Sequence, residues 1–134
     1  MDLDADTFKC ALYNNSITPD KDVSSANSAY NVGQWATAQE QYQAGQWAQA
    51  GVALTSRSLT NPSSGVVMFD AADTASGAAT TLSNVYGCLI YDDTLASPVV
   101  DQGVCFNYFG GAQSVSAGTL TVVWSANGIL SITA

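Results

Sequence analysis

Histidine is absent from this chain of 134 residues, so the side chain most often used for acid–base catalysis is missing. Without an imidazole, neither a Ser-His-Asp triad nor a Cys-His pair can be assembled. The chain also lacks the glycine-rich loop with a following lysine that cradles phosphates. Carboxylates and thiols are therefore the side chains left for chemistry.

The carboxylates lie in stretches typical of turns rather than of an active site. A glycosidase would need two of them to face each other across a cleft. The candidates all stand in turn-like sequence, where aspartate is common because its side chain bonds to nearby backbone: Asp70, Asp73, Asp92, Asp93 and Asp101. We expect no catalytic residue, and we predict that the protein is not an enzyme.

The N-terminal aspartates Asp2, Asp4 and Asp6 form a D-x-D-x-D pattern that resembles the start of a calcium loop. An EF-hand would require glycine at the position of Thr7 and glutamate at that of Tyr13, so the match fails. We expect no metal and no cofactor. We interpret these residues as the solvated start of a strand that continues to Leu12.

The three cysteines, Cys10, Cys88 and Cys105, are far apart in the sequence and form no C-x-x-C pair. Each alternates with apolar neighbours in a strand-like run. Zinc sites of the common types need closely spaced cysteines or histidines, and these are absent. We predict three reduced, largely buried thiols.

The charge content is low and acidic. Only 10% of the residues are charged, against about a quarter in a typical globular protein, and the net charge is −8. Three basic residues cannot neutralise a nucleic-acid backbone or bind an anionic membrane, and no apolar run approaches membrane-spanning length. The start MDLDAD resembles no signal peptide, so we expect synthesis in a cytoplasm. The composition suits either a subunit packed in an assembly or a monomer with a hydroxyl- and amide-rich surface.

Period-two alternation predicts about seven short strands separated by turn residues. The expected fold class is all-β: one domain over residues 1–134, built as an antiparallel β-sandwich or barrel. The expected strands are 2–12, 52–59, 66–69, 81–91, 103–109, 113–117 and a closing hairpin over 118–134.

The closing hairpin is predicted with a three-residue turn that ends at Gly128. This register pairs Trp124 with Leu130 and Val122 with Ile132, which places the apolar side chains on one face. Gly128 is then expected to have a positive φ.

Residues 24–50 form an Ala/Gln-rich insertion, which we expect to be a long loop or a short helix capped among Ser24, Ser25 and Asn27. Its aromatic residues are the partner-binding candidates: Tyr30, Trp35, Tyr42 and Trp47. They could anchor the loop to the sheet or to a neighbouring subunit, or they could form a platform on which sugar rings stack.

Several stretches together resemble the small β-rich virion proteins of tailed bacteriophages. In chain order they are DLDADTFKCALY with TPDKD after it, AGVALTSRSLT, FDAADT, GCLIYDDT, FNYFGG and GTLTVVWSANGILSITA. The segment 24–49 departs from this pattern because it contains a longer run of Gln and Ala residues.

The resemblance implies a structural role in a virus particle with no catalytic residues. The first expectation is a capsid decoration (cement) protein that binds the outer shell of the major capsid protein as a homo-oligomer, with a trimer as first guess. Its location would be the capsid surface of the virion, after synthesis in the host cytoplasm. A tail, neck or tail-surface component is the alternative, and a carbohydrate-binding β-sandwich module is the second alternative.

Overall fold

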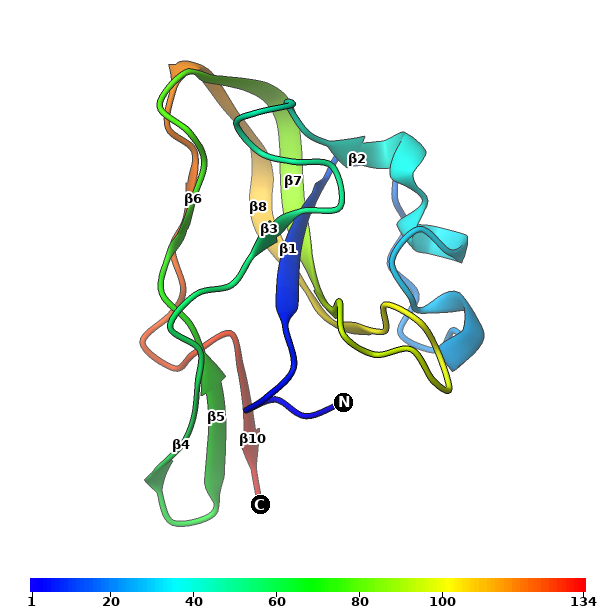
Figure 1. Ribbon diagram of the computed structural model, residues 1–134, viewed down its shortest axis with the longest axis vertical. Helices are drawn as coiled ribbons and strands as arrows, with labels where there is room; N and C mark the ends of the chain where they lie inside the picture. Colours follow the sequence, from blue (N-terminus) through cyan, green and yellow to red (C-terminus); the bar gives the residue numbers. More distant parts are fainter.

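The computed structural model describes residues 1–134 and is all-β, as the alternation predicts (Figure 1). Three single 3-10 turns, η1 to η3, lie between β1 and β2. The strands are β1 (Phe8–Tyr13), β2 (Glu40–Gln41), β3 (Val52–Ala53), β4 (Ser58–Ser63), β5 (Val66–Asp70), β6 (Thr74–Ala75), β7 (Thr80–Asp92), β8 (Gly103–Gly118), β9 (Thr121–Val122) and β10 (Leu130–Thr133); the 3-10 turns are Ser25–Asn27, Gly33–Trp35 and Thr37–Gln39.

The main sheet is antiparallel and curls into a half-barrel, in the order β2-β1-β7-β8. One edge of β1 pairs with β7 along its whole length, and its other edge pairs with β2 and β3. β1 is therefore central, and both of its faces are buried. Phe8, Cys10 and Leu12 pack into the larger core cluster, whereas Ala11 and Tyr13 pack into a smaller cluster on the opposite face.

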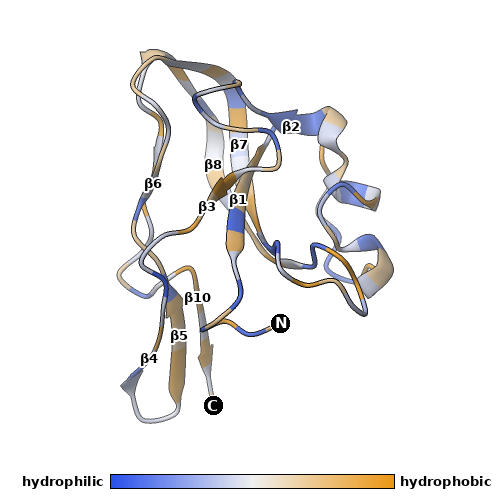
Figure 2. Cartoon of the chain, viewed as in Figure 1, coloured by the Kyte–Doolittle hydropathy of each residue, from blue (hydrophilic) through white to orange (hydrophobic).

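The remaining strands form two small sheets. β6 pairs with β9, and β10-β5-β4 form a three-stranded sheet that projects away from the half-barrel (Figure 1). We call this projecting sheet the arm. Its strands β5 and β10 carry apolar residues (Figure 2).

The predicted closing hairpin is wrong in its pairing. Leu130 pairs with Phe69 and Ile132 pairs with Val67, both on β5, while Trp124 donates its indole N–H to the carbonyl of Ala72 at 3.1 Å. The alternating apolar residues of β10 can pair with any strand that has an apolar face. β5 has such a face, because its Phe69 is buried in the core. The positive φ predicted for Gly128 is confirmed, at 79°. The three-residue turn is wrong, because Ser125 bridges to Gly128 and leaves a two-residue turn, with the Gly128 N–H donating to the Ser125 carbonyl at 2.8 Å.

The first strand begins later than predicted, at Phe8. Residues 2–6 form a turn instead, in which the Asp2 carboxylate accepts the N–H groups of Asp4 and Ala5, and the Asp6 N–H donates to the Asp2 carbonyl at 2.9 Å. Aspartate favours such local bonding over a ladder. The helix expected in the insertion is reduced to single 3-10 turns, and Ser24 makes no side-chain cap.

Candidate functional site

The two tryptophans of the insertion are buried within their own chain. Trp47 has no exposed surface and Trp35 is 5% exposed. The Trp35 ring packs 5.7 Å from that of Tyr13 and 5.1 Å from that of Phe106. Both indoles therefore anchor the insertion to the sheet. Neither ring has a face free for stacking on a sugar.

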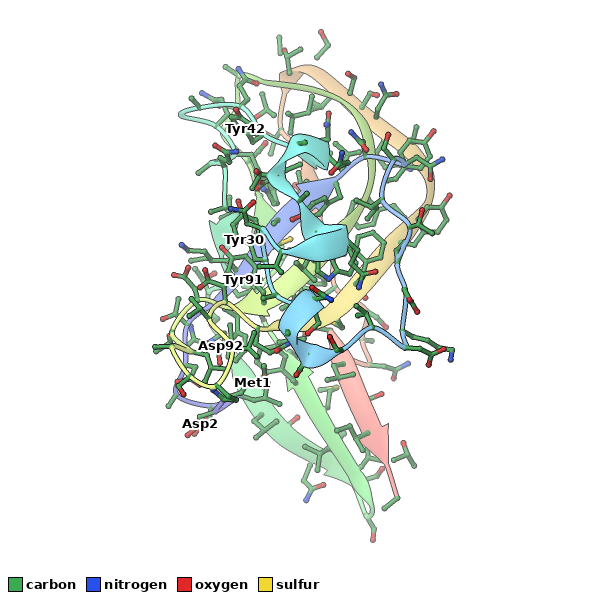
Figure 3. All side chains as sticks on the ribbon, turned by 90° about the vertical axis from the view of Figure 1, so that its right-hand side faces the viewer. Met1, Asp2, Tyr30, Tyr42, Tyr91 and Asp92 are labelled. Atoms are coloured by element: carbon green, nitrogen blue, oxygen red, sulfur yellow. The ribbon has the colours of Figure 1, made fainter.

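Tyr30 closes a buried polar network beneath the 3-10 turns. Its ring stacks on that of Tyr91, with 4.7 Å between centroids, and its hydroxyl donates to Glu40 Oε2 at 2.7 Å (Figure 3). The Ala50 N–H donates to Glu40 Oε1 at 2.8 Å, and the Tyr91 hydroxyl donates to the Ala50 carbonyl at 2.6 Å. Burial raises the pKa of Glu40, although the hydrogen bonds that it accepts from the Tyr30 hydroxyl and the Ala50 N–H oppose the shift. The network joins both ends of the insertion to β7.

Sequence patterns do not identify Glu40 as part of a buried network. The one indication in the sequence is that it is the single glutamate of the chain, between Gln39 and Gln41 in an otherwise uncharged stretch. Its partners come from positions 10 residues away on either side, which spacing alone does not reveal.

Tyr42 is the partner-binding candidate with the most exposed ring, at 46%. Tyr30 is half-buried against Tyr91. Of the four aromatic residues proposed to bind a partner, the structure therefore leaves Tyr42 accessible and brings the other three into the protein's own packing. Their role toward a partner stays a prediction.

Three carboxylates, those of Asp6, Asp92 and Asp93, lie at one end of the main sheet. Asp92 is buried, and its Oδ1 accepts the N–H groups of Thr94 and Leu95 at 2.9 and 3.1 Å. Burial raises the pKa of Asp92, and the neighbouring Asp6 raises it further. Figure 3 places Asp92 at the same end as Met1 and Asp2. The two hydrogen bonds to Asp92 Oδ1 stabilise the start of the loop that follows β7. No group of three or more His, Cys, Asp or Glu side chains is arranged to hold a metal ion.

The three cysteines lie on neighbouring strands, although they are far apart in the sequence. Cys10 and Cys105 both pair with Ile90, from opposite sides, and Cys88 is two residues from Ile90 on the same strand. All three are free; two are buried and Cys105 is partly buried. Burial raises the pKa of Cys10 well above its usual value and that of Cys105 to about 11. The thiols of Cys10 and Cys105 are therefore protonated near neutral pH.

The last stretch of the sequence, residues 102–134, contains no charged side chain. The 3 basic and 11 acidic residues all lie between Asp2 and Asp101, so β8, β9 and β10 carry no charge. The three most exposed large apolar side chains all fall in this region: Tyr108, Val123 and Ile132 are 59%, 69% and 61% exposed. A monomer seldom concentrates exposed apolar side chains where it has no charge. We call residues 102–134 the neutral region.

Two apolar grooves flank β8. One, of about 350 Å³, lies between β8 and β9 and is lined by Phe109, Gln113 and residues 120–123. The other, of about 390 Å³, is lined mainly by Ile17, Pro19, Tyr86, Phe106 and Tyr108. Neither groove contains a charged side chain. Both grooves therefore present apolar and uncharged polar side chains.

Comparisons of this chain with protein-family models, with curated proteins and with solved structures find no match. The helical segments are single 3-10 turns, and none is long or apolar enough to cross a membrane.

Proposed function

We propose that this protein is a non-enzymatic structural subunit of a tailed-phage particle, and specifically a capsid decoration protein that binds the outer shell as a homo-oligomer. The observation that carries the proposal is the neutral region, where Tyr108, Val123 and Ile132 expose apolar surface. Contact with other proteins would cover this surface. The sequence resemblance to small phage virion proteins supplies the kind of assembly.

The distribution of charge supports an orientation. Asp6, Asp92 and Asp93 lie together at one end of the main sheet, where Lys9 Nζ is 2.8 Å from Asp93 Oδ1. Acidic groups repel DNA phosphates, so this end would point away from a DNA-filled interior. The neutral region would lie against the shell and neighbouring copies. Capsid lattices offer many threefold positions, so we expect trimers.

A tail or neck component would use the same neutral surfaces, and it remains the alternative. A carbohydrate-binding module is less well supported, because the tryptophans on which that idea rests are buried. Probing with a glycan array distinguishes this second alternative from the other two.

The test is to mix purified protein with capsids that lack it and to measure bound protein and resistance to heat. Binding should saturate at a fixed number of copies and raise the temperature at which DNA escapes. Val123→Asp places a charge in the neutral region and should abolish binding. Val100→Asp, at a site 58% exposed in the acidic loop, is the matched control and should bind normally. Binding to tails but not to capsids would transfer the role to the tail.

A further inference from the structure

We propose that the groove between β8 and β9 binds the arm of a second copy of this chain, through the free edge of β10, so that copies join head to tail. This contact deepens the structural role proposed above and rests on it. Both halves of the contact are visible on the single chain, because the groove and the arm each have an apolar surface that nothing covers.

The groove is an open seam in the half-barrel. Phe109 and Gln113 of β8 form one wall, and residues 120–123, in and around β9, form the other. Leu120 and Val122 pack toward the core, whereas Val123 is 69% exposed. The seam therefore has an apolar floor and an exposed apolar rim.

Both walls of the seam have a free strand edge. β8 is the end strand of the main sheet and pairs only with β7. β9 pairs only with β6, and the neighbouring backbone bonds of Leu120 also point to that side, toward Ser76. The backbone groups of Thr121 and Val123 make no hydrogen bond outside the β6–β9 ladder. An extended segment placed in the seam could therefore bond to backbone as well as bury its side chains.

β8 is irregular beside the seam, which limits how a strand can enter. Its register against β7 shifts between the pairs Val85–Gln113 and Gly87–Tyr108, so residues 109–112 bulge. A long regular strand would not fit along this edge. A short one of about four residues, roughly 13 Å long, would pair with β9 and avoid the bulge.

The arm supplies a strand of that length. β10 has four residues, pairs only with β5 and leaves its outer edge free. The arm is amphipathic: its apolar face carries Phe69 at the buried root and Val67 and Ile132 farther out, at 42% and 61% exposure. Figure 1 shows that this end of the arm projects beyond the half-barrel. Nothing within the same chain covers it.

Charge favours a second copy as the occupant. Two chains of net charge −8 repel, so surfaces without charge favour their association. The seam and β10 both lie in the neutral region, which contains no lysine or arginine that could bind an acidic partner. A partner recognised through the acidic end would have to be basic, and that end is elsewhere on the fold.

The contact joins two different surfaces, so its symmetry is heterologous and it closes only as a ring. A four-residue strand buries less than the roughly 800 Å² per partner of a standard stable interface. A single contact is therefore weak, and ring closure stabilises the set because the last contact forms within one assembly. Assembly should depend on concentration and shift from monomer to ring without an abundant dimer.

Complementation in solution tests this arrangement, and it needs no capsid. Val123→Asp disables the seam and leaves the arm; Ile132→Asp disables the arm and leaves the seam. In sedimentation velocity the wild type and the Val100→Asp control should assemble, and each of the two variants alone should be monomeric. Their equimolar mixture can form one contact per pair, so a species of twice the monomer mass should appear only at high protein concentration. Far-UV spectra and melting curves establish that both variants fold.

Cross-linking can trap a contact that is too weak to be detected by sedimentation. Val123→Cys and Ile132→Cys chains, mixed and mildly oxidised, should give a disulfide-linked heterodimer in excess over both homodimers. Val123→Cys mixed with Ala96→Cys, an exposed site on the acidic loop, is the control. The proposal is overturned if both charge variants alone assemble as the wild type does, or if no heterodimer exceeds the control. Variants that assemble normally but fail to bind capsids would assign the seam to the shell instead. Normal complementation without capsid binding would overturn only the capsid role.

Discussion

Replacing Gly128 by alanine should loosen the root of the arm, and Gly45→Ala provides the matched control. Both glycines have positive φ, 79° and 77° respectively. An added Cβ at Gly45 would meet nothing within 4 Å, whereas at Gly128 it would lie 2.6 Å from both the Phe69 carbonyl oxygen and Met68 Cγ. The two variants therefore share the backbone penalty and differ only in the close approach.

The magnitudes follow from these two terms. A left-handed alanine costs about 1–2 kcal/mol, which is the whole expected effect of Gly45→Ala. At Gly128 the clash must also displace the Phe69 carbonyl, which accepts the Ile129 N–H at 2.9 Å, so about 1–3 kcal/mol is added. Phe69 is buried in the core, so this loss reaches the whole domain rather than the arm alone.

Thermal melts followed by circular dichroism measure the difference. At about 4 °C per kcal/mol for a domain of this size, Gly128→Ala should melt about 4–12 °C below Gly45→Ala. Equal melting temperatures for the two variants would refute the close approach of residue 128 to β5, and with it the way the arm is attached.

Three further predictions concern the core and the buried acids. Thiol titration of the native protein should find Cys105 slow, because burial raises its pKa to about 11, and the two buried cysteines unreactive until denaturant is added, because the reagent cannot reach them; rapid reaction of three thiols would contradict this. Asp92→Asn keeps Oδ1 as an acceptor but removes a carboxyl whose pKa is raised in the folded state. The folded protein holds that proton more tightly, so stability falls as pH rises through the raised pKa, and wild type should gain stability over the variant on acidification from pH 7 toward about 4; parallel pH profiles would rule this out. Trp47→Ala should cost about 3–5 kcal/mol in urea unfolding, whereas Tyr42→Ala should cost less than about 0.5 kcal/mol; a stable Trp47→Ala protein would mean that the indole is not an internal anchor.

The fold class could be predicted because period-two alternation reports directly on strands that bury one face. The positive φ of Gly128 could also be predicted, since Asn-Gly has strong local preferences, but the turn has two residues rather than the three predicted. The partner of β10 could not. The alternation of Leu130 and Ile132 fits a partner strand close in the sequence as well as it fits β5, which lies more than 60 positions earlier. Alternation carries no information on which strand lies opposite.

The candidate site shows the same division. The aromatic residues of the insertion were visible, but whether Trp35 and Trp47 face a partner or their own sheet depends on how residues 24–50 fold back. The absence of charge after Asp101 was present in the sequence, yet its meaning depends on the open seam and the projecting arm. Glu40 gained its role only from Tyr30 and Ala50, which the fold brings to it.

A low-resolution reconstruction of phage particles carrying the bound protein tests the structural role most directly. Density should appear on the outside of the shell, clustered around local threefold axes. The neutral region should face the shell and neighbouring copies, and the acidic end should point outward. Density on the tail or neck alone, or particles that bind no protein at saturating concentration, would contradict the assignment to the capsid surface.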